Sequence, residues 1–322
     1  MDNNILYIIV PCYNEEEILP SSAQSLETKV DTLIQNKIIS PTSRIIFVND
    51  GSRDHTWPLI QKLHAKNKLF GGISLSRNEG HQNALLAGLL TCKSICDFAI
   101  TIDADLQDDI DAINHMIQAY KKGYQIVYGV RDDRRSDNLF KRSSAQTFYR
   151  LLKFLGAKVV YNHADFRLIS KKALTALDQF SEVNLFLRGL IPMLGFPSTQ
   201  VKYQRKKRLK GTSKYPIKKM IDLAIQGITS LSVKPLQLIS LLGGTIFLVS
   251  IIFFVYTFFR HFTGQTISGW SSLMLSIWAL GGLLMLSLGT VGEYIGKIYL
   301  ETKHRPRFIV DQVINDRTEE KK

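Results

Sequence analysis

The chain has 322 residues, of which 45% are hydrophobic and 21% are charged, and its formal net charge at pH 7 is +13. That length suits one large domain with an appendage, or two domains. The basic residues cluster beside two long apolar segments, so an anionic membrane surface and phosphate-bearing ligands explain the charge better than nucleic acid, which is not expected as a partner. The three cysteines, Cys12, Cys92 and Cys96, show no metal-ligand spacing, and we expect reduced thiols.

Apolar segments and turn signals alternate over the first 130 residues. Residues 5–10 form a continuous apolar run, which is typical of a strand in a sheet that is covered on both faces. Helices are expected to end at about Asn36 and at about Thr91. Further strands are expected at residues 44–48, 72–76, 97–102 and 125–130. The alternation predicts a doubly wound α/β domain with right-handed crossovers.

An acidic loop follows the strand expected at residues 97–102. It contains Asp103 and Asp105, and in an open α/β sheet ligands gather beyond the carboxyl ends of the strands. Two carboxylates one residue apart can share a cation such as Mg²⁺, which would neutralise a departing diphosphate. The alternative is a solvated turn in which Asp108 or Asp109 caps the next helix. The sequence has no Gly-x-Gly-x-x-Gly after the first strand and no Walker-type Gly-Lys-Ser/Thr loop, which argues against dinucleotide dehydrogenases and P-loop enzymes.

Two segments in the C-terminal third are long enough and apolar enough to cross a bilayer. No charged side chain occurs in residues 235–259 or in residues 262–292. A membrane-spanning helix needs about 20 apolar residues. We therefore expect two transmembrane helices, at about residues 236–259 and 271–293. The alternative is a pair of buried core helices.

Charges beside the two expected spans predict their orientation. The connecting loop carries only Arg260 and His261, whereas basic residues precede the first span and follow the second. By the positive-inside rule, both termini then lie in the cytoplasm and the protein is a multi-pass protein of the cell membrane. Residues 1–4 lack the basic region of a signal peptide, so we expect the first 230 residues to stay in the cytoplasm. The flanking basic residues are Lys218, Lys219, Lys234, Lys297, Lys303, Arg305 and Arg307.

Five segments stand out along the chain: Val10-Pro11-Cys12-Tyr13-Asn14-Glu15-Glu16, Val48-Asn49-Asp50-Gly51-Ser52, Asp103-Ala104-Asp105-Leu106-Gln107-Asp108, Ala164-Asp165-Phe166-Arg167 and Gly211-Thr212-Ser213-Lys214-Tyr215. In this order they resemble the successive motifs of family 2 glycosyltransferases. The nearest branch is that of dolichol-phosphate mannose synthase and bacterial undecaprenyl-phosphate (bactoprenol) glycosyltransferases, and the similarity spans about residues 5–300. The resemblance implies a GT-A-type domain, a nucleotide-sugar donor, a polyprenyl-phosphate acceptor, inversion at the anomeric carbon, Mg²⁺ or Mn²⁺ as cofactor, and a homotetramer.

The resemblance implies a nucleoside pocket at the ends of the first two strands. Its lining would be Pro11, Tyr13, Glu15 and Asp50. Asp50 lies at a strand end, where its carboxylate could hydrogen-bond the base or the ribose. The alternative for Asp50 is a simple Asp-Gly turn.

The resemblance also implies roles for the other acidic residues. Asp103 would contact the donor ribose or the metal, while Asp105, a catalytic residue, and Gln107 would hold the metal on the diphosphate. Asp165 matches the aspartate proposed in the family as the general base. A phosphate monoester has a second pKa of about 6 and needs little deprotonation at pH 7, so Asp165 could instead orient groups or stabilise positive charge on the sugar. A salt bridge between Asp165 and Arg167 is the structural alternative.

Basic residues are expected to meet the two anionic ligands. By motif position, Arg131, Arg208 and Lys214 would bind phosphate, since the planar fork of arginine donates two parallel hydrogen bonds. Residues 215–233 are predicted to form an amphipathic helix that lies in the membrane interface or packs on the soluble domain. His81, in a loop that lies near the donor in the family, is either a donor contact or a packing residue.

The expected organisation is a cytoplasmic glycosyltransferase domain at residues 1–214, an interfacial helix at 215–233, the two spans within 234–296 and a cytoplasmic tail at 297–322, in which residues 307–313 are expected to add a strand. The expected reaction transfers a sugar from UDP-glucose or UDP-N-acetylglucosamine to undecaprenyl or another polyprenyl phosphate, for use in the cell envelope. Two alternatives stay open: transfer by the same fold to a hydroxyl of a membrane glycan or lipid, or a non-catalytic membrane scaffold.

Overall fold

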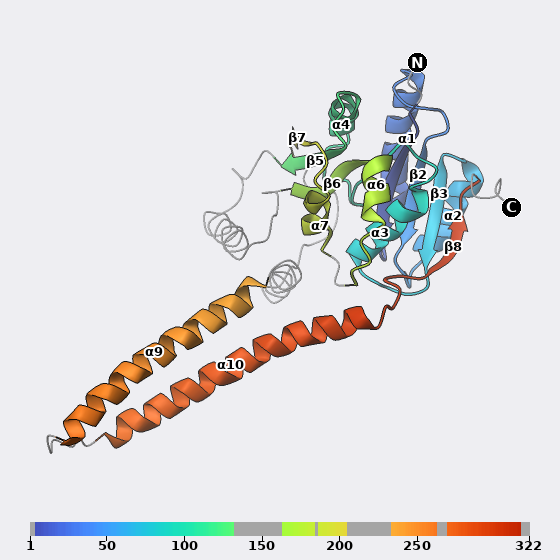
Figure 1. Cartoon of the computed structure of the whole chain (residues 1–322). Coiled ribbons are helices and arrows are strands. Elements are labelled where there is room, and N and C mark those ends of the chain that lie inside the picture. The colour runs from blue at the N-terminus through green and yellow to red at the C-terminus, as the bar shows by residue number, and fades with distance from the viewer. Residues whose placement is uncertain (1–3, 132–162, 184–185, 205–232, 263–268, 317–322) are drawn as a thin grey trace.

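The globular part of the protein is built on one mixed β-sheet (Figure 1). The computed structural model describes residues 4–131, 163–183, 186–204, 233–262 and 269–316. Over these residues the sheet has eight strands in the order β7-β5-β6-β4-β1-β2-β3-β8. The strands are β1 Leu6–Cys12, β2 Arg44–Asn49, β3 Phe70–Leu75, β4 Phe98–Thr101, β5 Ile126–Arg131, β6 His163–Ser170, β7 Ser198–Tyr203 and β8 Val310–Ile314. The helices are α1 Leu19–Gln35, α2 Thr56–Lys66, α3 His81–Cys92, α4 Ala112–Lys121, α6 Lys171–Leu177, α7 Leu187–Met193, α9 Lys234–Phe262 and α10 Trp270–Thr302.

Two of these strands run against the direction of the others. β6 is antiparallel to β4 and β5, and β8 is antiparallel to β3, whereas the other neighbouring pairs are parallel. The five expected strands appear as β1 to β5, so the α/β class is confirmed. The prediction of a doubly wound sheet needs correction, because the sheet is mixed. The apolar pattern does not predict β6, since Asp165 and Arg167 interrupt it.

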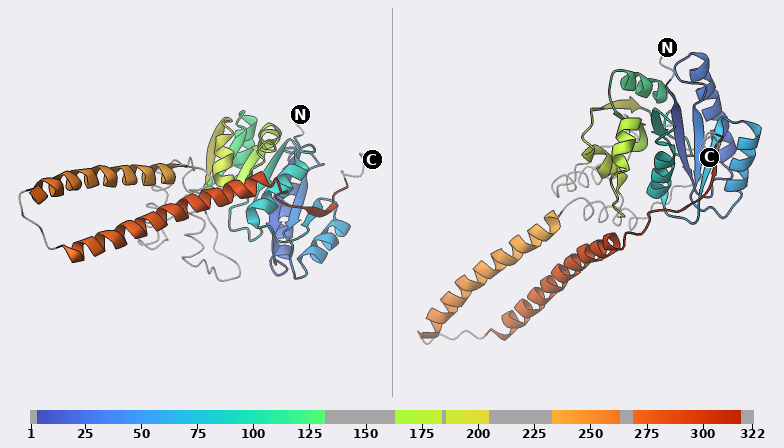
Figure 2. Two further views of the ribbon diagram at one scale, coloured as in Figure 1. Left: turned by 60° about the horizontal axis from the view of Figure 1, so that its bottom comes forward. Right: turned by 45° about the vertical axis from the view of Figure 1, so that its right-hand side comes forward.

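Helices cover both faces of the sheet (Figure 2). On one face, α1, α2 and α4 pack on Leu6, Ile8 and Val10 of β1. On the other face, α3, α6 and α7 pack on Tyr7 and Ile9 of the same strand. Because successive side chains of a strand point to opposite faces, a strand that is buried on both sides needs a continuous apolar run. Burial of each such large apolar side chain stabilises the fold by about 1.5–3 kcal/mol.

Two long helices, α9 and α10, extend away from the globular part beside each other (Figure 1). The expected spans, residues 236–259 and 271–293, fall inside them. Among the described residues, one stretch is long and apolar enough to cross a membrane, Ala279–Thr302 of α10, and none of it is buried in the protein. That exposure excludes the alternative of a buried core helix for this stretch. The expectation of two spans is therefore supported for one of them.

After α10 the chain returns to the sheet and adds the edge strand β8. Its pairing with β3 places Ile314 opposite Gly72 and Val313 opposite Ile73. The strand expected at about residues 307–313 is thus confirmed, with a start and an end slightly later in the chain. The expected interfacial helix at residues 215–233 lies outside the described residues.

Candidate active site

The carboxyl end of β4 and the first residues of β6 meet at one edge of the sheet. β4 ends at Thr101, and the acidic loop with Asp103 follows it. β6 pairs antiparallel with β4 and places Arg167 opposite Thr101, so Asp165 lies at the same edge as the acidic loop. Thr101 Oγ1 donates a hydrogen bond to the backbone carbonyl oxygen of Asp165. The reversed direction of β6 is therefore what joins the two acidic segments.

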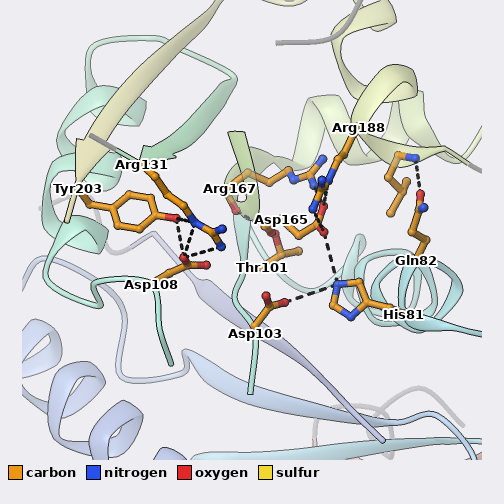
Figure 3. A network of polar contacts seen from close by, with 11 residues as sticks. His81, Gln82, Thr101, Asp103, Asp108, Arg131, Asp165, Arg167, Arg188 and Tyr203 are labelled. Carbon is orange, nitrogen blue, oxygen red and sulfur yellow. Dashed lines mark hydrogen bonds and ion pairs between the residues drawn. The ribbon is translucent and has the colours of Figure 1, made fainter. Parts of the chain in front are cut away.

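His81 lies between two of these carboxylates (Figure 3). Its Nε2 atom is 3.5 Å from Asp103 Oδ1 and 3.6 Å from Asp165 Oδ2. Burial lowers the pKa of His81, but Asp165 and Asp103 outweigh burial and the net shift of the pKa is upward. The environment thus favours the charged imidazolium between the two carboxylates. His81 opens α3 directly after Gly80, whose φ of 89° is a conformation that favours glycine.

Asp165 is buried and bound by two arginines. Arg188 donates from Nη2 to Asp165 Oδ2 at 2.9 Å and from Nε to Oδ1 at 3.3 Å, and Arg167 Nη2 donates to Oδ1. Burial raises the pKa of a carboxyl group, but His81, Arg188 and Arg167 hold the pKa of Asp165 well below its usual value. The salt bridge with Arg167, which the sequence left as an alternative, is present. Asp165 is therefore a fixed anion at this edge of the sheet.

Arg188 is a site residue that the sequence does not single out. It lies on α7, where the remaining residues are apolar, glycine or proline. Its side chain is 34% exposed although its guanidinium binds a buried carboxylate, so part of it faces the solvent. A lone arginine in an apolar helix signals a paired partner. The sequence does not identify that partner, because Asp165 lies on a different element.

Asp103 is held in an environment that disfavours its negative charge. Burial raises its pKa to about 6; His81 opposes that shift, and the neighbouring carboxylates, led by Asp165, add to it. Asp103 Oδ1 is buried and accepts no hydrogen bond from the described residues. Beyond the 3.5 Å ion pair with His81, crowded carboxylates with an oxygen that accepts no hydrogen bond fit a bound cation, because the cation supplies further positive charge.

The residues expected to hold a metal share the loop after β4. Asp105 is partly exposed, Gln107 is buried, and the Gln107 backbone N–H donates to Asp105 Oδ1 at 3.3 Å. Within the described ranges, no three His, Cys, Asp or Glu side chains are arranged to hold a metal ion. Two carboxylates, Asp103 and Asp105, with the Gln107 amide oxygen nevertheless suit Mg²⁺, which usually keeps waters and substrate phosphate oxygens as its other ligands.

Arg131, expected to bind phosphate, is oriented by Asp108 and Tyr203 (Figure 3). Asp108 Oδ1 accepts from Tyr203 Oη at 2.6 Å and from Arg131 Nη2 at 3.2 Å. The parallel pairing of β5 with β7 places Arg131 beside Tyr203. Asp108 therefore does not cap the next helix, and α4 begins after Asp111. Arg131 is 29% exposed, so its guanidinium is held in place yet reachable from solvent.

The loops that follow β1 and β2 are hydrogen-bonded to each other, where the sequence places the nucleoside pocket. Glu15 N donates to Thr56 Oγ1 at 2.9 Å, and Asn14 N donates to Ser52 Oγ at 3.0 Å. Pro11 is buried in β1, whereas Tyr13 is 44% exposed. Of the four expected pocket residues, Tyr13 thus presents the largest accessible side chain.

Asp50 contacts the loop that leads to His81. Its Oδ1 accepts from Glu79 N at 2.7 Å and its Oδ2 accepts from Gly80 N at 3.0 Å. The next residue, Gly51, has a φ of 62°, so the Asp-Gly turn also occurs. Asp50 is 3% exposed, and its observed contacts are therefore those of a residue that shapes the start of α3. The expected phosphate contacts Arg208 and Lys214 lie outside the described residues.

The mixed α/β sheet carries acidic residues beyond its strand ends, where open α/β sheets commonly bind their ligands. Residues 7–177 match the model of glycosyl transferase family 2. The chain belongs to this family and is a glycosyltransferase. The resemblance to this family is thereby confirmed, and four of the five motifs lie within the matched residues.

Curated relatives resemble the chain over almost its whole length. The uncharacterized glycosyltransferase YkoT of Bacillus subtilis (strain 168) is 49% identical over 307 residues, which cover 95% of this chain and 91% of that protein. The bactoprenol glucosyl transferase of Shigella phage SfV is 36% identical over 306 residues, covering 94% of this chain and 97% of that protein. The protein is therefore related to bactoprenol glucosyl transferases.

Solved structures resemble the chain more distantly. A crystal structure of glucosyl-3-phosphoglycerate synthase from Mycobacterium tuberculosis, in complex with Mn²⁺, UDP-glucose and phosphoglyceric acid, has 17% sequence identity and a TM-score of 0.44, over 71% of this chain and 78% of that chain. So distant a likeness indicates nothing about the ligands of this protein.

Proposed function

We propose that this glycosyltransferase moves a sugar, with inversion, from a nucleotide-sugar to a polyprenyl phosphate and makes a polyprenyl-monophosphate sugar. The choice of a polyprenyl phosphate as acceptor rests on the 36% identity to a bactoprenol glucosyl transferase over 94% of this chain. The site geometry supports the donor, because Asp103 and Asp105 lie beyond a strand end where diphosphates are commonly bound. UDP-glucose and UDP-N-acetylglucosamine are the proposed donors.

The acidic loop would hold Mg²⁺ or Mn²⁺ through Asp103, Asp105 and Gln107. The buried Asp103 Oδ1, which accepts no hydrogen bond from the described residues, supports this assignment. When bound, such a cation supplies positive charge that neutralises the departing nucleoside diphosphate. In this proposal Asp105 is the second carboxylate ligand of the cation.

Asp165 acts as a fixed anion in the proposed reaction. Because His81, Arg188 and Arg167 hold its pKa well below the usual value, Asp165 is a poor proton acceptor. The acceptor needs no strong base, since a phosphate monoester has a second pKa of about 6 and is largely ionised at pH 7. The phosphate oxygen attacks the anomeric carbon, the bond to the nucleoside diphosphate breaks, and Asp165 stabilises the positive charge that develops on the sugar.

The remaining assignments divide between the two ligands. Tyr13, Glu15 and Pro11 line the nucleoside end of the pocket, and Asp50 supports that end by fixing the loop before His81. Arg131 binds a phosphate group from the opposite side of the site. Its partners Asp108 and Tyr203 keep the planar guanidinium in one orientation, which favours bidentate binding of a phosphate. We assign Arg208 and Lys214 to phosphate binding as well.

The proposed location is the cell membrane, with α9 and α10 as two spans and both termini in the cytoplasm. The exposed apolar stretch Ala279–Thr302 supports the second of these spans. Residues 1–214 form the catalytic domain in this proposal, residues 215–233 lie at the membrane interface, and residues 297–322 return to the cytoplasm. A homotetramer is the proposed assembly.

A donor screen tests the proposed function. The purified full-length protein in detergent is given undecaprenyl phosphate, Mg²⁺ or Mn²⁺, and a panel of UDP- and GDP-sugars, and the lipid product is measured by mass spectrometry. We expect one donor to give the mass of a sugar-phosphate lipid, and Asp105→Asn to abolish that product. Turnover of no donor by the wild-type protein would contradict the proposal.

A further inference from the structure

The last turn of α10 contacts the segment that leads into α7. Both carboxylate oxygens of Glu301 accept from the Val183 backbone N–H, each at 2.9 Å. A few residues further on, Arg307 Nη1 donates to the Phe180 carbonyl oxygen at 2.8 Å. The C-terminal end of α10, the helix with the candidate membrane span, is therefore hydrogen-bonded to residues 180–183 of the globular part.

The same segment continues into the site through α7. Val183 lies four residues before Leu187, the first residue of α7, and the next residue is Arg188, which binds Asp165. The Leu187 backbone N–H donates to Gln82 Oε1 at 2.7 Å (Figure 3). Gln82 follows His81 on α3, so the start of α7 is held next to the histidine that bridges the two carboxylates.

Apolar packing joins the residues beside these two contacts to one core cluster. Leu187, Leu190 and Ile191 of α7 are buried in the core cluster on their face of the sheet, and Phe180 and Phe308 pack against the same cluster. Beyond Phe308 the chain enters β8, which is paired with β3. The chain after α10 therefore packs against the same core cluster as α7.

We propose that Glu301 is a positioning residue for Arg188: it holds the backbone of Val183, four residues before α7, and so helps to hold the guanidinium of Arg188 on Asp165. A charged acceptor binds a backbone N–H more strongly than a neutral one, and Glu301 offers two oxygens to a single N–H. Without this contact the start of α7 is held less firmly, and Arg188 binds Asp165 for less of the time. The inference rests on the proposed function of Asp165, and it makes the docking of the membrane helix a condition for the active arrangement.

The test compares Glu301→Ala, Glu301→Gln and a control, Gln312→Ala, in the full-length protein. Gln312 lies on β8 and accepts from Trp57 Nε1 at 3.2 Å, so the control perturbs the same C-terminal segment away from α7. Hydrogen exchange at residues 180–190 and steady-state kinetics are measured on each. We expect Glu301→Ala to accelerate hydrogen exchange at residues 180–190. We also expect kcat to fall about 10-fold, because a misplaced catalytic group slows the reaction, and the KM for the donor to stay unchanged. Glu301→Gln, which keeps an acceptor oxygen, restores most of the rate, and Gln312→Ala changes neither quantity.

A double-mutant cycle with Arg188→Gln separates positioning from general stability. If Glu301 acts through Arg188, Glu301→Ala lowers kcat no further in the Arg188→Gln background. Additive losses, an unchanged kcat in Glu301→Ala, or equal losses in Glu301→Ala and Gln312→Ala would overturn the inference. Failure of the proposed function shows differently, because the wild-type protein would then make no sugar-phosphate lipid, while the exchange at residues 180–190 still reports whether Glu301 holds this segment.

Discussion

Replacing Asp165 by asparagine removes a buried negative charge at nearly constant side-chain volume. The Arg167 side chain beside it is 1% exposed, and its Nε and Nη1 atoms have no hydrogen-bond partner among the described residues. Asp165 is thus the charge that compensates a buried guanidinium. The Asp165→Asn variant leaves that guanidinium with a neutral amide oxygen in place of the carboxylate.

The size of the effect follows from this burial. Removing one partner of a buried ion pair costs about 3–5 kcal/mol, because the remaining charge is uncompensated. The amide oxygen of Asn still accepts one hydrogen bond. We therefore expect Asp165→Asn to lower the free energy of unfolding by about 3 kcal/mol, the low end of this range. For a domain of about 200 residues, a loss of 1 kcal/mol lowers Tm by about 2–4 °C, which predicts a fall of about 6–12 °C.

Thermal unfolding in detergent measures this difference, with Asp316→Asn as the control. Asp316 Oδ1 pairs with Lys68 Nζ at 3.1 Å, both side chains are exposed (43% and 59%), and exposed pairs contribute at most about 1 kcal/mol. We therefore expect a large fall in Tm for Asp165→Asn and a small one for Asp316→Asn. Equal Tm values for the two variants would show that Asp165 does not compensate a buried charge.

The pH dependence of this difference has a definite sign. The pKa of Asp165 in the folded state lies well below its usual value, so ionised Asp165 stabilises the fold above the unfolded-state pKa of about 3.9. That stabilisation is lost as the pH falls through the lower, folded-state pKa. The part of the Tm difference that comes from the ionisation of Asp165 itself is therefore constant at neutral pH and shrinks only in strong acid. Asp165 also raises the pKa of His81, and the part of the difference that comes from His81 is lost as the pH rises through the folded-state pKa of that histidine.

Further predictions concern other parts of the site. Tyr203→Phe removes the hydroxyl that donates to Asp108 and frees Arg131 to reorient. We expect the KM for the lipid phosphate to rise and kcat/KM to fall about 10-fold, equivalent to about 1.4 kcal/mol. An unchanged KM would count against this role of Tyr203. Gly51→Ala places a Cβ 2.5 Å from the backbone of residues 77–78 at a φ of 62°, so denaturation should show a loss of at least about 1–3 kcal/mol. Chelation of divalent cations should abolish sugar transfer and added Mn²⁺ should restore it; full activity in excess EDTA would contradict the metal assignment.

The part of the site that lies directly beyond strand ends was predictable from the sequence. β1 to β4 are largely apolar and are followed by polar residues. Because the strands are parallel, the polar residues beyond their carboxyl ends lie at one edge of the sheet. For that reason Asp103 and Asp105 could be placed there without a structure. The helical character of residues 236–259 and 271–293 was predictable for a similar reason, because long uncharged apolar segments have few alternatives.

The contacts between distant segments were not predictable. Arg188 meets Asp165, and Tyr203 meets Arg131, only because β6 is inserted antiparallel between β4 and β5 and β7 joins the edge. β6 contains charged residues that are buried by pairing, and a pattern of hydrophobicity does not reveal pairing. Asp50 illustrates the same limit, since its motif position does not predict that its carboxylate binds the backbone of residues 79–80.

The most direct test of the central claim compares two acceptors that differ by one phosphate group. The purified full-length protein is given its active nucleotide-sugar with either undecaprenyl phosphate or the corresponding undecaprenol, and the lipid products are weighed by mass spectrometry. We expect a sugar-phosphate lipid from the phosphate and no product from the alcohol. Transfer to the alcohol, with none to the phosphate, would contradict it.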